Sequence, residues 1–442
     1  MGYQVHKFGG SCLTCIEDIS AITSRVRNSL GQPLVIVSAF HGITDRIIEQ
    51  INRNNEASIE AFVSSVELEH LELIPEIVNS PWSVRFAETL HYLKVKLQSY
   101  CENPSVEVRY DALACGERLS SLAISAALDA AGIPAIPGWS EDIGISVIGS
   151  GESAQIDARK TREILKLPLG AVPVITGWYG VSNQKIALLG RGGSDLSATA
   201  IAETVNADQV TIWRDVQGVL ALSPKWSLPG RNLSNLSYTE AAELALFSEP
   251  MLHPSAVDPL RIPGIPLRLR PLHAPDLEGT IIGPSLITES PIVRAVGCLP
   301  RLVPISWTLS SALSLVESVS DATAALGMAR IRVVSIRAQP GRVRILVNQK
   351  SATRAERILS ERPSLPTPLV GESISILCFV GEGIGQDLSV RSRIEQASIE
   401  GGVTLSFNAD EHRPHAIHAA VPAQQTESAL RALCLALDLL VN

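Results

Sequence analysis

The chain has 442 residues, of which 45% are hydrophobic and 19% are charged. This composition is typical of a globular protein, and the length allows two to four domains with full cores. The formal net charge of −8 argues against a nucleic-acid partner or an anionic membrane partner. No stretch reaches the roughly 20 apolar residues of a membrane helix, and residues 1–30 do not read as a signal peptide, so we expect a cytoplasmic protein.

A glycine turn follows the first predicted strand. Residues 3–8 read as this strand, and residues 16–30 have the periodicity of a helix. Between them lies the run Lys7-Phe8-Gly9-Gly10-Ser11. Glycines let several backbone N–H groups approach one anion, and the lysine places a positive charge directly before the turn. The run therefore predicts a phosphate-binding turn.

The next predicted strand, residues 34–37, is followed by hydroxyl groups. Ser38 comes directly after it, and Thr44 lies in the run Gly42-Ile43-Thr44-Asp45. Open α/β sheets bind their ligands at the carboxyl ends of the strands. We therefore expect both hydroxyl groups at a ligand site.

Residues 46–100 contain no glycine and have helical periodicity, which predicts a helical excursion from the sheet. After this segment, the run Gly116-Glu117-Arg118-Leu119-Ser120 places a carboxylate at the start of a predicted apolar helix over residues 122–131. Glu117 fits two roles there, helix capping and ligand binding, and the sequence leaves both open.

The most informative run is Gly190-Arg191-Gly192-Gly193-Ser194-Asp195, between a predicted strand over residues 187–189 and a predicted helix over residues 196–206. Its glycines and the positive end of the new helix suit a phosphate, and Arg191 and Asp195 add one charge of each sign. The run lacks the spacing of the Walker loop and of the dinucleotide fingerprint, so it predicts a phosphate site of another fold. Two such turns suggest one triphosphate held from both sides.

A linker is predicted after residue 280, where Gly283-Pro284 and Ser290-Pro291 interrupt the pattern. The remaining residues read as strand, helix, strand, strand, helix, repeated imperfectly, which fits two ferredoxin-like α+β modules. We therefore expect domains over residues 1–285, 291–365 and 370–442.

In their order and amino-acid sequence, these motifs resemble those of the aspartate kinases in the amino acid kinase family. The first glycine turn is similar to the family's opening Lys-Phe-Gly-Gly-Ser/Thr motif, and the second is similar to its Gly-Arg-Gly-Gly-Ser-Asp motif. The likeness continues through residues 172–177 and 212–219 to about residue 282. The resemblance implies a three-layer α/β kinase domain with an open, mostly parallel sheet, followed by two ferredoxin-like modules of the ACT type.

The resemblance also implies phosphorylation of the side-chain carboxylate of L-aspartate, or of a close analogue, with ATP and Mg²⁺ as cofactors. A carboxylate acceptor is ionised at neutral pH, so no general base is required. The implied catalytic residues are Lys7, Arg191 and Asp195. The implied substrate-binding residues are Ser38, Thr44, Glu117, Arg191 and Ser194. The implied nucleotide-binding residues are Lys7, Gly9, Gly10, Ser11, Gly192, Gly193, Asp215, Pro224 and Lys225, and no motif fixes the ligands of the metal.

The ACT modules of such kinases usually pair in a homodimer and bind an amino-acid effector. This implies an effector site at Gly381, Gly383 and Gly385, in the turn between the first strand and helix of the second module. The equivalent junction of the first module, residues 307–311, has no glycine. We therefore expect weak or absent feedback inhibition by lysine or threonine, and dimerisation alone stays open as the role of both modules.

The nucleotide half departs from the family's pattern at Arg214, Leu220, Ser223 and Pro250, which replace a threonine, a tyrosine, an aspartate and a lysine. Three interpretations stay open. The chain is a slower ATP-dependent kinase in which Arg214 and Lys225 compensate, a kinase with an altered substrate or nucleotide preference, or a non-catalytic subunit that senses an amino acid.

Overall fold

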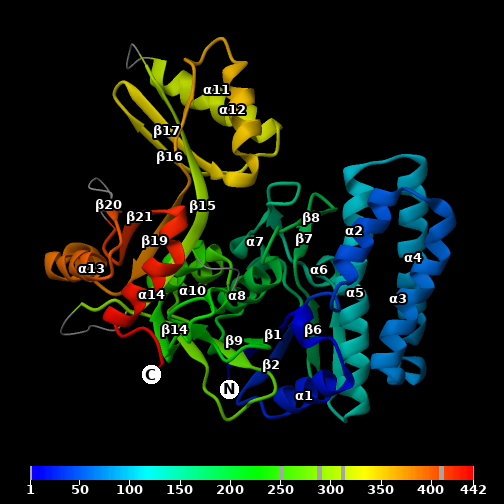
Figure 1. Ribbon diagram of the computed structural model, residues 1–442. Coiled ribbons are helices and arrows are strands. Elements are labelled where there is room, and N and C mark those ends of the chain that lie inside the picture. The colour runs from blue at the N-terminus through cyan, green and yellow to red at the C-terminus, as the bar shows by residue number, and fades with distance from the viewer. Residues whose placement is uncertain (1, 248–251, 286–290, 310–313, 408–412, 442) are drawn as a thin grey trace. The chain divides into compact units, whose positions relative to one another are not determined.

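The computed structural model describes residues 2–247, 252–285, 291–309, 314–407 and 413–441 (Figure 1). The chain forms two compact units. The first comprises Met1–Val219, Asn232–Ala245 and Pro250–Leu286, and the second comprises Leu220–Arg231, Leu246–Glu249 and Ile287–Asn442. None of the helices within the described ranges is long and apolar enough to span a membrane.

An eight-stranded sheet forms the centre of the first unit, in the order β12-β14-β13-β9-β1-β2-β6-β3. All neighbours run parallel except β13 and β14, so the predicted open, mostly parallel sheet is confirmed. Its strands are β1 (Tyr3–Phe8), β2 (Gln32–Val37), β3 (Ala135–Gly138), β6 (Val172–Thr176), β9 (Gln209–Arg214), β12 (Asn235–Ser237), β13 (Leu267–Pro271) and β14 (Thr280–Gly283).

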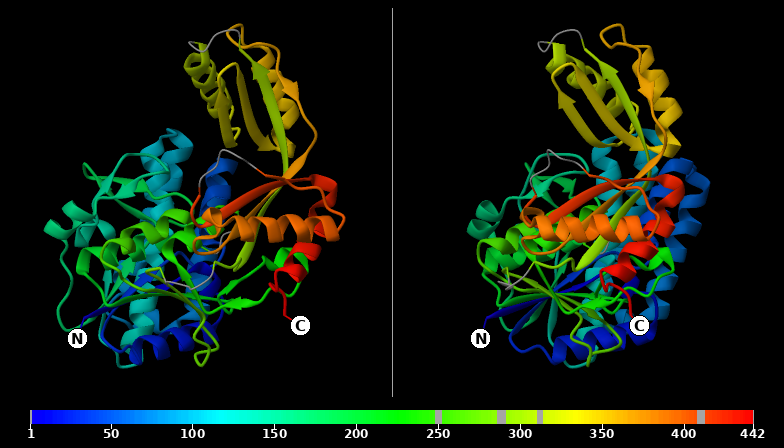
Figure 2. Two further views of the ribbon diagram at one scale, coloured as in Figure 1. Left: turned by 90° about the vertical axis from the view of Figure 1, so that its left-hand side faces the viewer. Right: turned by 60° about the vertical axis from the view of Figure 1, so that its left-hand side comes forward.

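Helices cover both faces of this sheet and give three layers (Figure 2). The helices up to residue 261 are α1 (Ile16–Arg27), α2 (Ile43–Arg53), α3 (Ile59–Leu73), α4 (Ser83–Glu102), α5 (Val106–Ala130), α6 (Ser140–Ile143), α7 (Ala158–Ile164), α8 (Gly193–Val205), α9 (Tyr238–Phe247) and α10 (Asp258–Arg261). α5 packs against β2, β3 and β6, whereas α8 packs against β1, β2 and β9. Because the central strands are covered on both faces, they are continuously apolar, as Leu34, Val35, Ile36 and Val37 of β2 illustrate.

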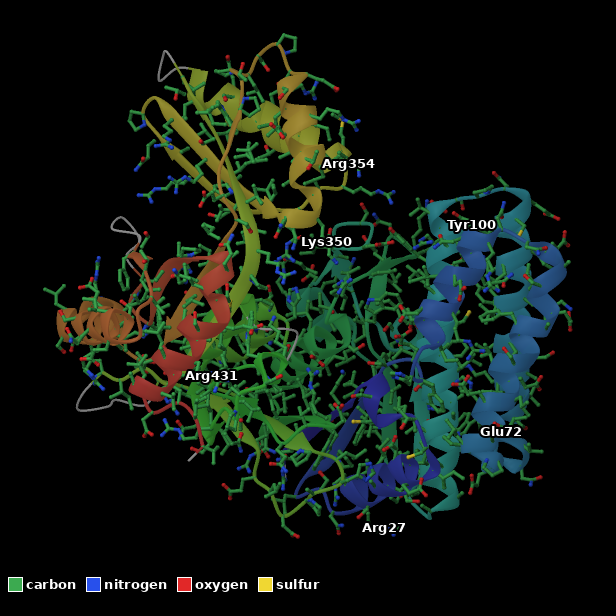
Figure 3. The ribbon with its side chains drawn as sticks, viewed as in Figure 1. Arg27, Glu72, Tyr100, Lys350, Arg354 and Arg431 are labelled. Carbon is green, nitrogen blue, oxygen red and sulfur yellow. The ribbon has the colours of Figure 1, made fainter. Side chains whose placement is uncertain are left out.

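The glycine-free segment forms α2, α3 and α4, and α4 packs along α5. Glu72 near the end of α3 and Tyr100 near the end of α4 lie at opposite ends of this helical layer, so the two helices run antiparallel (Figure 3). Short two-stranded pairs complete the region, formed by β4 (Val147–Ile148) with β5 (Gln155–Ile156), β7 (Tyr179–Ser182) with β8 (Lys185–Leu188), and β10 (Val219–Leu220) with β11 (Asn232–Leu233).

The predicted helix start near Glu117 is wrong. α5 begins at Val106, where the Ser105 hydroxyl accepts a hydrogen bond from the N–H of Val108 at 3.2 Å. Gly116 suggested a boundary because glycine usually interrupts a helix. Within α5 this glycine instead allows close packing, because a Cβ atom there would lie 2.8 Å from the Cβ of Ala39. Glu117 therefore lies in mid-helix, and helix capping is excluded as its role.

The second unit contains one antiparallel sheet in the order β16-β17-β15-β19-β21-β20, with β18 paired to β15. The strands are β15 (Ala295–Thr308), β16 (Val333–Gln339), β17 (Arg342–Asn348), β18 (Leu369–Val370), β19 (Ile374–Val380), β20 (Ser406–Phe407) and β21 (Ala416–Pro422). The helices are α11 (Ser314–Met328), α12 (Ala352–Ser360), α13 (Leu388–Glu400) and α14 (Thr426–Ala436). The two ferredoxin-like modules are thus confirmed, with one feature that the sequence did not predict.

That feature is a strand shared by both modules. The second half of β15, residues 302–308, pairs with β17 in the first module, and residues 295–299 pair with β19 in the second. The second module therefore takes its fourth strand from a segment that precedes the first module. Pro304 lies inside β15, although proline is usually confined to edge strands and bulges.

The core of the first module depends on Trp307, which is 1% exposed and donates a hydrogen bond from Nε1 to the Ser318 hydroxyl at 2.6 Å. We expect Trp307→Ala to lower the free energy of unfolding by roughly 3–5 kcal/mol, because it leaves a large cavity. Urea unfolding of the full chain, followed by circular dichroism, measures the loss. Val316→Ala is the control, because Val316 is 76% exposed. Equal losses in the two variants would contradict the prediction.

Candidate functional site

The site lies at the carboxyl ends of three adjacent parallel strands, β9, β1 and β2. Lys7 is the penultimate residue of β1, and Ser38 follows β2 directly. Arg214 is the last residue of β9, and Asp215 follows it. Since the carboxyl ends of parallel strands meet at one edge, the sheet brings these predicted residues together.

A buried group of three charges occupies this edge. The Nζ atom of Lys7 lies 2.7 Å from Oδ1 of Asp195, and Nη2 of Arg214 lies 2.7 Å from Oδ2 of the same carboxylate. The side chains of Lys7 and Asp195 are 8% and 6% exposed. Two cations share one anion, so the group carries a net positive charge that suits an anionic ligand.

The charge state of Asp195 follows from these contacts. Burial by itself would raise the pKa of the Asp195 carboxyl, but the positive charges of Lys7 and Arg214 outweigh burial and lower the pKa below its usual value. Asp195 also lies in the first turn of α8, where a negative charge is stabilised by the helix dipole. The carboxylate is therefore ionised at neutral pH and holds both cations.

The second glycine turn needs glycine for its geometry. Gly192 caps α8 with a left-handed φ of 70°, and a Cβ atom there would lie 2.7 Å from the Cβ of His253. α8 begins at Gly193, three residues before the predicted helix, so Ser194 and Asp195 belong to its first turn. The turn and the helix start thus lie beside Lys7.

Glu117 reaches the same edge from α5. Its Oε1 atom accepts a hydrogen bond from the N–H of Ala39 at 3.1 Å, while Oε2 is buried with no hydrogen-bond partner among the described residues. Burial raises the pKa of Glu117 to about 8, although the Ala39 hydrogen bond and the charge of Lys7 each lower it. A buried acceptor without a donor costs free energy, so this oxygen indicates a cationic or N–H group of a ligand.

The structure places the other predicted residues in different settings. Ser38 and Thr44 are half-buried, Ser194 is buried, and Arg191 is exposed in the turn before α8. Gly9 and Gly10 follow β1, and Ser11 is exposed in the 3₁₀ turn Gly10–Cys12. Pro224 and Lys225 belong to the second unit, and their role in nucleotide binding stays a prediction. Pro250 lies outside the described residues.

The predicted effector glycines form a tightly packed turn. The N–H groups of Gly381 and Gly385 donate to the carbonyls of His415 and Pro414 at 3.1 and 3.0 Å. The N–H of Gly383 donates to Nδ1 of His415 at 3.2 Å. All three backbone donors are thus engaged within the second module, and the effector role of these glycines stays a prediction.

Sequence reasoning missed the residues that hold the loop after the first glycine turn. Asp18 accepts hydrogen bonds through Oδ2 from the hydroxyl and the N–H of Thr14 at 2.6 and 2.9 Å, and its Oδ1 lies 2.6 Å from Nε2 of His273. An acidic residue three positions after the N-cap residue Cys15 was the available signal, because it is typical of a capping box. The contact with His273 had no signal in the sequence.

Comparison with known proteins identifies the family. Residues 2–270, more than half of the chain, match the amino acid kinase family. The chloroplastic aspartokinase 2 of Arabidopsis thaliana is 29% identical over 297 residues, which are 63% of this chain and 54% of that relative. An aspartokinase of Bacillus sp. strain MGA3 is 28% identical over 300 residues, which are 66% of this chain and 61% of the relative. The chain thus spans less than two thirds of these relatives.

Solved structures share the fold along the whole chain. Aspartokinase III of E. coli in complex with aspartate and ADP has a TM-score of 0.81 at 20% identity and covers 99% of this chain. The aspartate kinase of Clostridium acetobutylicum has a TM-score of 0.76 at 20% identity, also over 99% of the chain. All of that structure and of the E. coli structure is covered. With both glycine turns inside the matched residues, the chain belongs to the amino acid kinase family.

Proposed function

We propose that the chain is an ATP-dependent kinase that phosphorylates the side-chain carboxylate of L-aspartate to give 4-phospho-L-aspartate. The observation that carries this proposal is the buried ion pair of Lys7 and Asp195, which lies where two glycine turns meet the sheet edge. The aspartokinase names of its relatives, and the aspartate and ADP bound to its E. coli structural neighbour, support the same reaction.

The phosphate end of the site would be formed by cations and backbone donors. Phosphoryl transfer depends on neutralising charge and on position more than on covalent help from the protein. Lys7 would contact the transferred phosphoryl group, and Arg214 would add a second positive charge beside it. Asp195 would hold both cations in place. The glycines of the two turns would let the backbone approach the remaining phosphates.

Magnesium would enter with the triphosphate, whose oxygens supply most of its ligands. Both oxygens of Asp195 contact cations, which leaves Asp215 as the carboxylate next to β9 that could hold the metal. Mg²⁺ would supply further charge neutralisation at the phosphates.

The amino-acid end would be formed by Glu117 and Arg191. The buried Oε2 of Glu117 would accept a hydrogen bond from the ammonium group of aspartate. Arg191 would bind its α-carboxylate, since a guanidinium matches a carboxylate with two parallel hydrogen bonds. Ser38 and Thr44 would donate hydrogen bonds to the remaining oxygens. The side-chain carboxylate would then face Lys7 for in-line attack.

The test is formation of an acyl phosphate from MgATP and L-aspartate, trapped with hydroxylamine as the hydroxamate. We expect product with the unmodified chain and its loss in Lys7→Ala, because the transferring group loses its main cation. Lys185→Ala is the matched control, since Lys185 is an exposed lysine that pairs with Glu107 on the surface. Aspartate analogues and other nucleotides belong in the same assay. Arg214 and Leu220 differ from the family's pattern, and this difference bears on the specificity for the substrate and for the nucleotide.

Absence of product with every pair, together with calorimetric binding of aspartate, would contradict the kinase. The alternative of a non-catalytic sensing subunit would then hold.

We also propose a homodimer formed through the second unit, and light scattering on the full chain measures its mass. A monomer at every concentration would contradict the dimer.

A further inference from the structure

The short connection between β6 and β7 lies against the second glycine turn, and Trp178 belongs to this connection. A Cβ atom at Gly193 would lie 2.7 Å from Cδ1 of Trp178, and a Cβ atom at Gly177 would lie 2.8 Å from the Cβ of Ser194. Each segment thus lacks a side chain at the point where the other approaches it. This packing places Trp178 directly beside the second glycine turn and the start of α8.

Trp178 is connected by hydrogen bonds to both ends of this turn. Its indole Nε1 donates to the carbonyl of Gly190 at 2.9 Å, and its own carbonyl accepts from the N–H of Leu189 at 2.8 Å. Its backbone N–H donates to the hydroxyl of Ser197 at 3.0 Å, and this hydroxyl donates to the carbonyl of Gly193 at 3.0 Å. One residue therefore holds the residue before the turn, the first glycine of the turn and the helix after it.

The backbone of Trp178 has a conformation that tryptophan rarely adopts. Its φ is 69°, in the left-handed region that favours glycine. A bulky residue keeps such a conformation only where its surroundings fix it, and residues of this kind are concentrated at functional sites. Here the hydrogen bonds of its N–H, carbonyl and indole groups fix it. The strained backbone therefore points to a function for the contact with the second glycine turn.

Arg191 lies in the segment that Trp178 holds. Gly190 and Gly192 flank it, both with a left-handed φ, of 73° and 70°. Glycine has more backbone freedom than any other residue, so a fixed conformation on both sides of Arg191 depends on contacts from outside the turn. The exposed side chain of Arg191 makes no ion pair or hydrogen bond with any residue that the structure describes. Its position is therefore set by the backbone of the turn.

We propose that Trp178 is a positioning residue, whose indole N–H fixes the second glycine turn so that Arg191 is presented to the α-carboxylate of the substrate. The hold on the turn rests on the contacts of Trp178 alone. The consequence for aspartate binding rests on the proposed function, so the two parts need separate measurements.

Trp178→Phe removes the indole donor and keeps an aromatic ring, and hydrogen exchange of the full chain, followed by mass spectrometry, measures the hold on the turn. We expect peptides that cover residues 189–197 to exchange about tenfold faster in this variant, a factor typical of one lost hydrogen bond. Peptides from β2 should keep their rates.

Trp139→Phe is the matched control for hydrogen exchange. Trp139 is another half-buried tryptophan of the first unit, but its Nε1 has no hydrogen-bond partner among the described residues. Its replacement should leave the exchange of residues 189–197 unchanged. Equal exchange of this segment in the two variants would overturn the proposal, as would an equal increase in all peptides of Trp178→Phe.

Hydroxamate kinetics on the same variants measure the consequence for the substrate. Trp178→Phe should raise the KM for aspartate about tenfold, for the same lost hydrogen bond, and leave kcat nearly unchanged. In an Arg191→Ala background it should raise KM no further, because the guanidinium that it positions is absent. A fall in kcat with an unchanged KM would overturn the link to Arg191. Inactivity of the unmodified chain would contradict the proposed function, whereas hydrogen exchange would still decide the hold on the turn.

Discussion

Asp195→Ala is expected to lower kcat by roughly a hundred- to a thousand-fold and the free energy of unfolding by about 3–5 kcal/mol. Asp195 lies 2.7 Å from both Lys7 and Arg214 and is the anion that these two cations share. Alanine would leave two positive charges facing each other in a buried place. Hydroxamate kinetics and urea unfolding measure the two losses on the same preparation.

A double-mutant cycle tests whether the two cations share the carboxylate. Arg214→Ala removes one of them, so Asp195→Ala should cost less stability in that background, by roughly 0.5–3 kcal/mol. Asp208→Ala is the control, because Asp208 is an exposed carboxylate just before β9. The same cost of Asp195→Ala with and without Arg214 would contradict the shared contact.

The sequence predicted that the two glycine turns serve one site, and the contact of Lys7 with Asp195 agrees with this because the signals are local. The glycine turns after Lys7 and before Asp195 each join a strand to a helix, and parallel strands bring such turns to one edge of a sheet. The contact of Arg214 with Asp195 could not be predicted, although the arginine was noticed as a departure. It joins the end of β9 to the first turn of α8, and only the packing of α8 on the sheet brings these two ends together.

One error arose because a local pattern was overridden by packing. A helix was predicted to start near Glu117, but Gly116 and Glu117 lie inside α5, where the absence of a side chain at Gly116 lets the helix approach Ala39. A long-range partner decided this case, since Ala39 is distant in sequence from Gly116.

The difference in the free energy of unfolding between Glu117→Gln and the unmodified protein is expected to grow in favour of the variant as pH rises from about 4.5 to about 8. Burial raises the pKa of Glu117 to about 8, so the folded chain keeps the proton in this range while the unfolded chain loses it. Stability therefore falls by up to about 1.4 kcal/mol per pH unit in the unmodified protein, to a total of a few kcal/mol. Glutamine has no such proton to lose, so the difference between the two proteins grows with pH and levels off above 8.

Urea unfolding at pH 5, 6.5 and 8 measures this difference. Glu107→Gln is the matched control, because Glu107 lies on the same helix but is exposed, with a surface lysine as its partner. Its effect on the free energy of unfolding at pH 8 should be smaller than that of Glu117→Gln. If the difference in the free energy of unfolding between Glu117→Gln and the unmodified protein does not depend on pH, the carboxyl of Glu117 titrates normally. The buried Oε2 atom would then not indicate a ligand.

If the chain binds aspartate as proposed, the same proton links stability to that binding. An ammonium group is bound by the ionised carboxylate, so binding below pH 8 must first remove the proton from Glu117. We therefore expect the KM for aspartate to fall as pH rises from 6.5 to 8.5. Glu117→Gln should abolish this dependence and raise KM by about 30-fold at pH 8, which corresponds to about 2 kcal/mol for an unpaired buried charge. If the KM of Glu117→Gln keeps its pH dependence, the group that titrates is not Glu117. The contact with the ammonium group would then also belong to another residue.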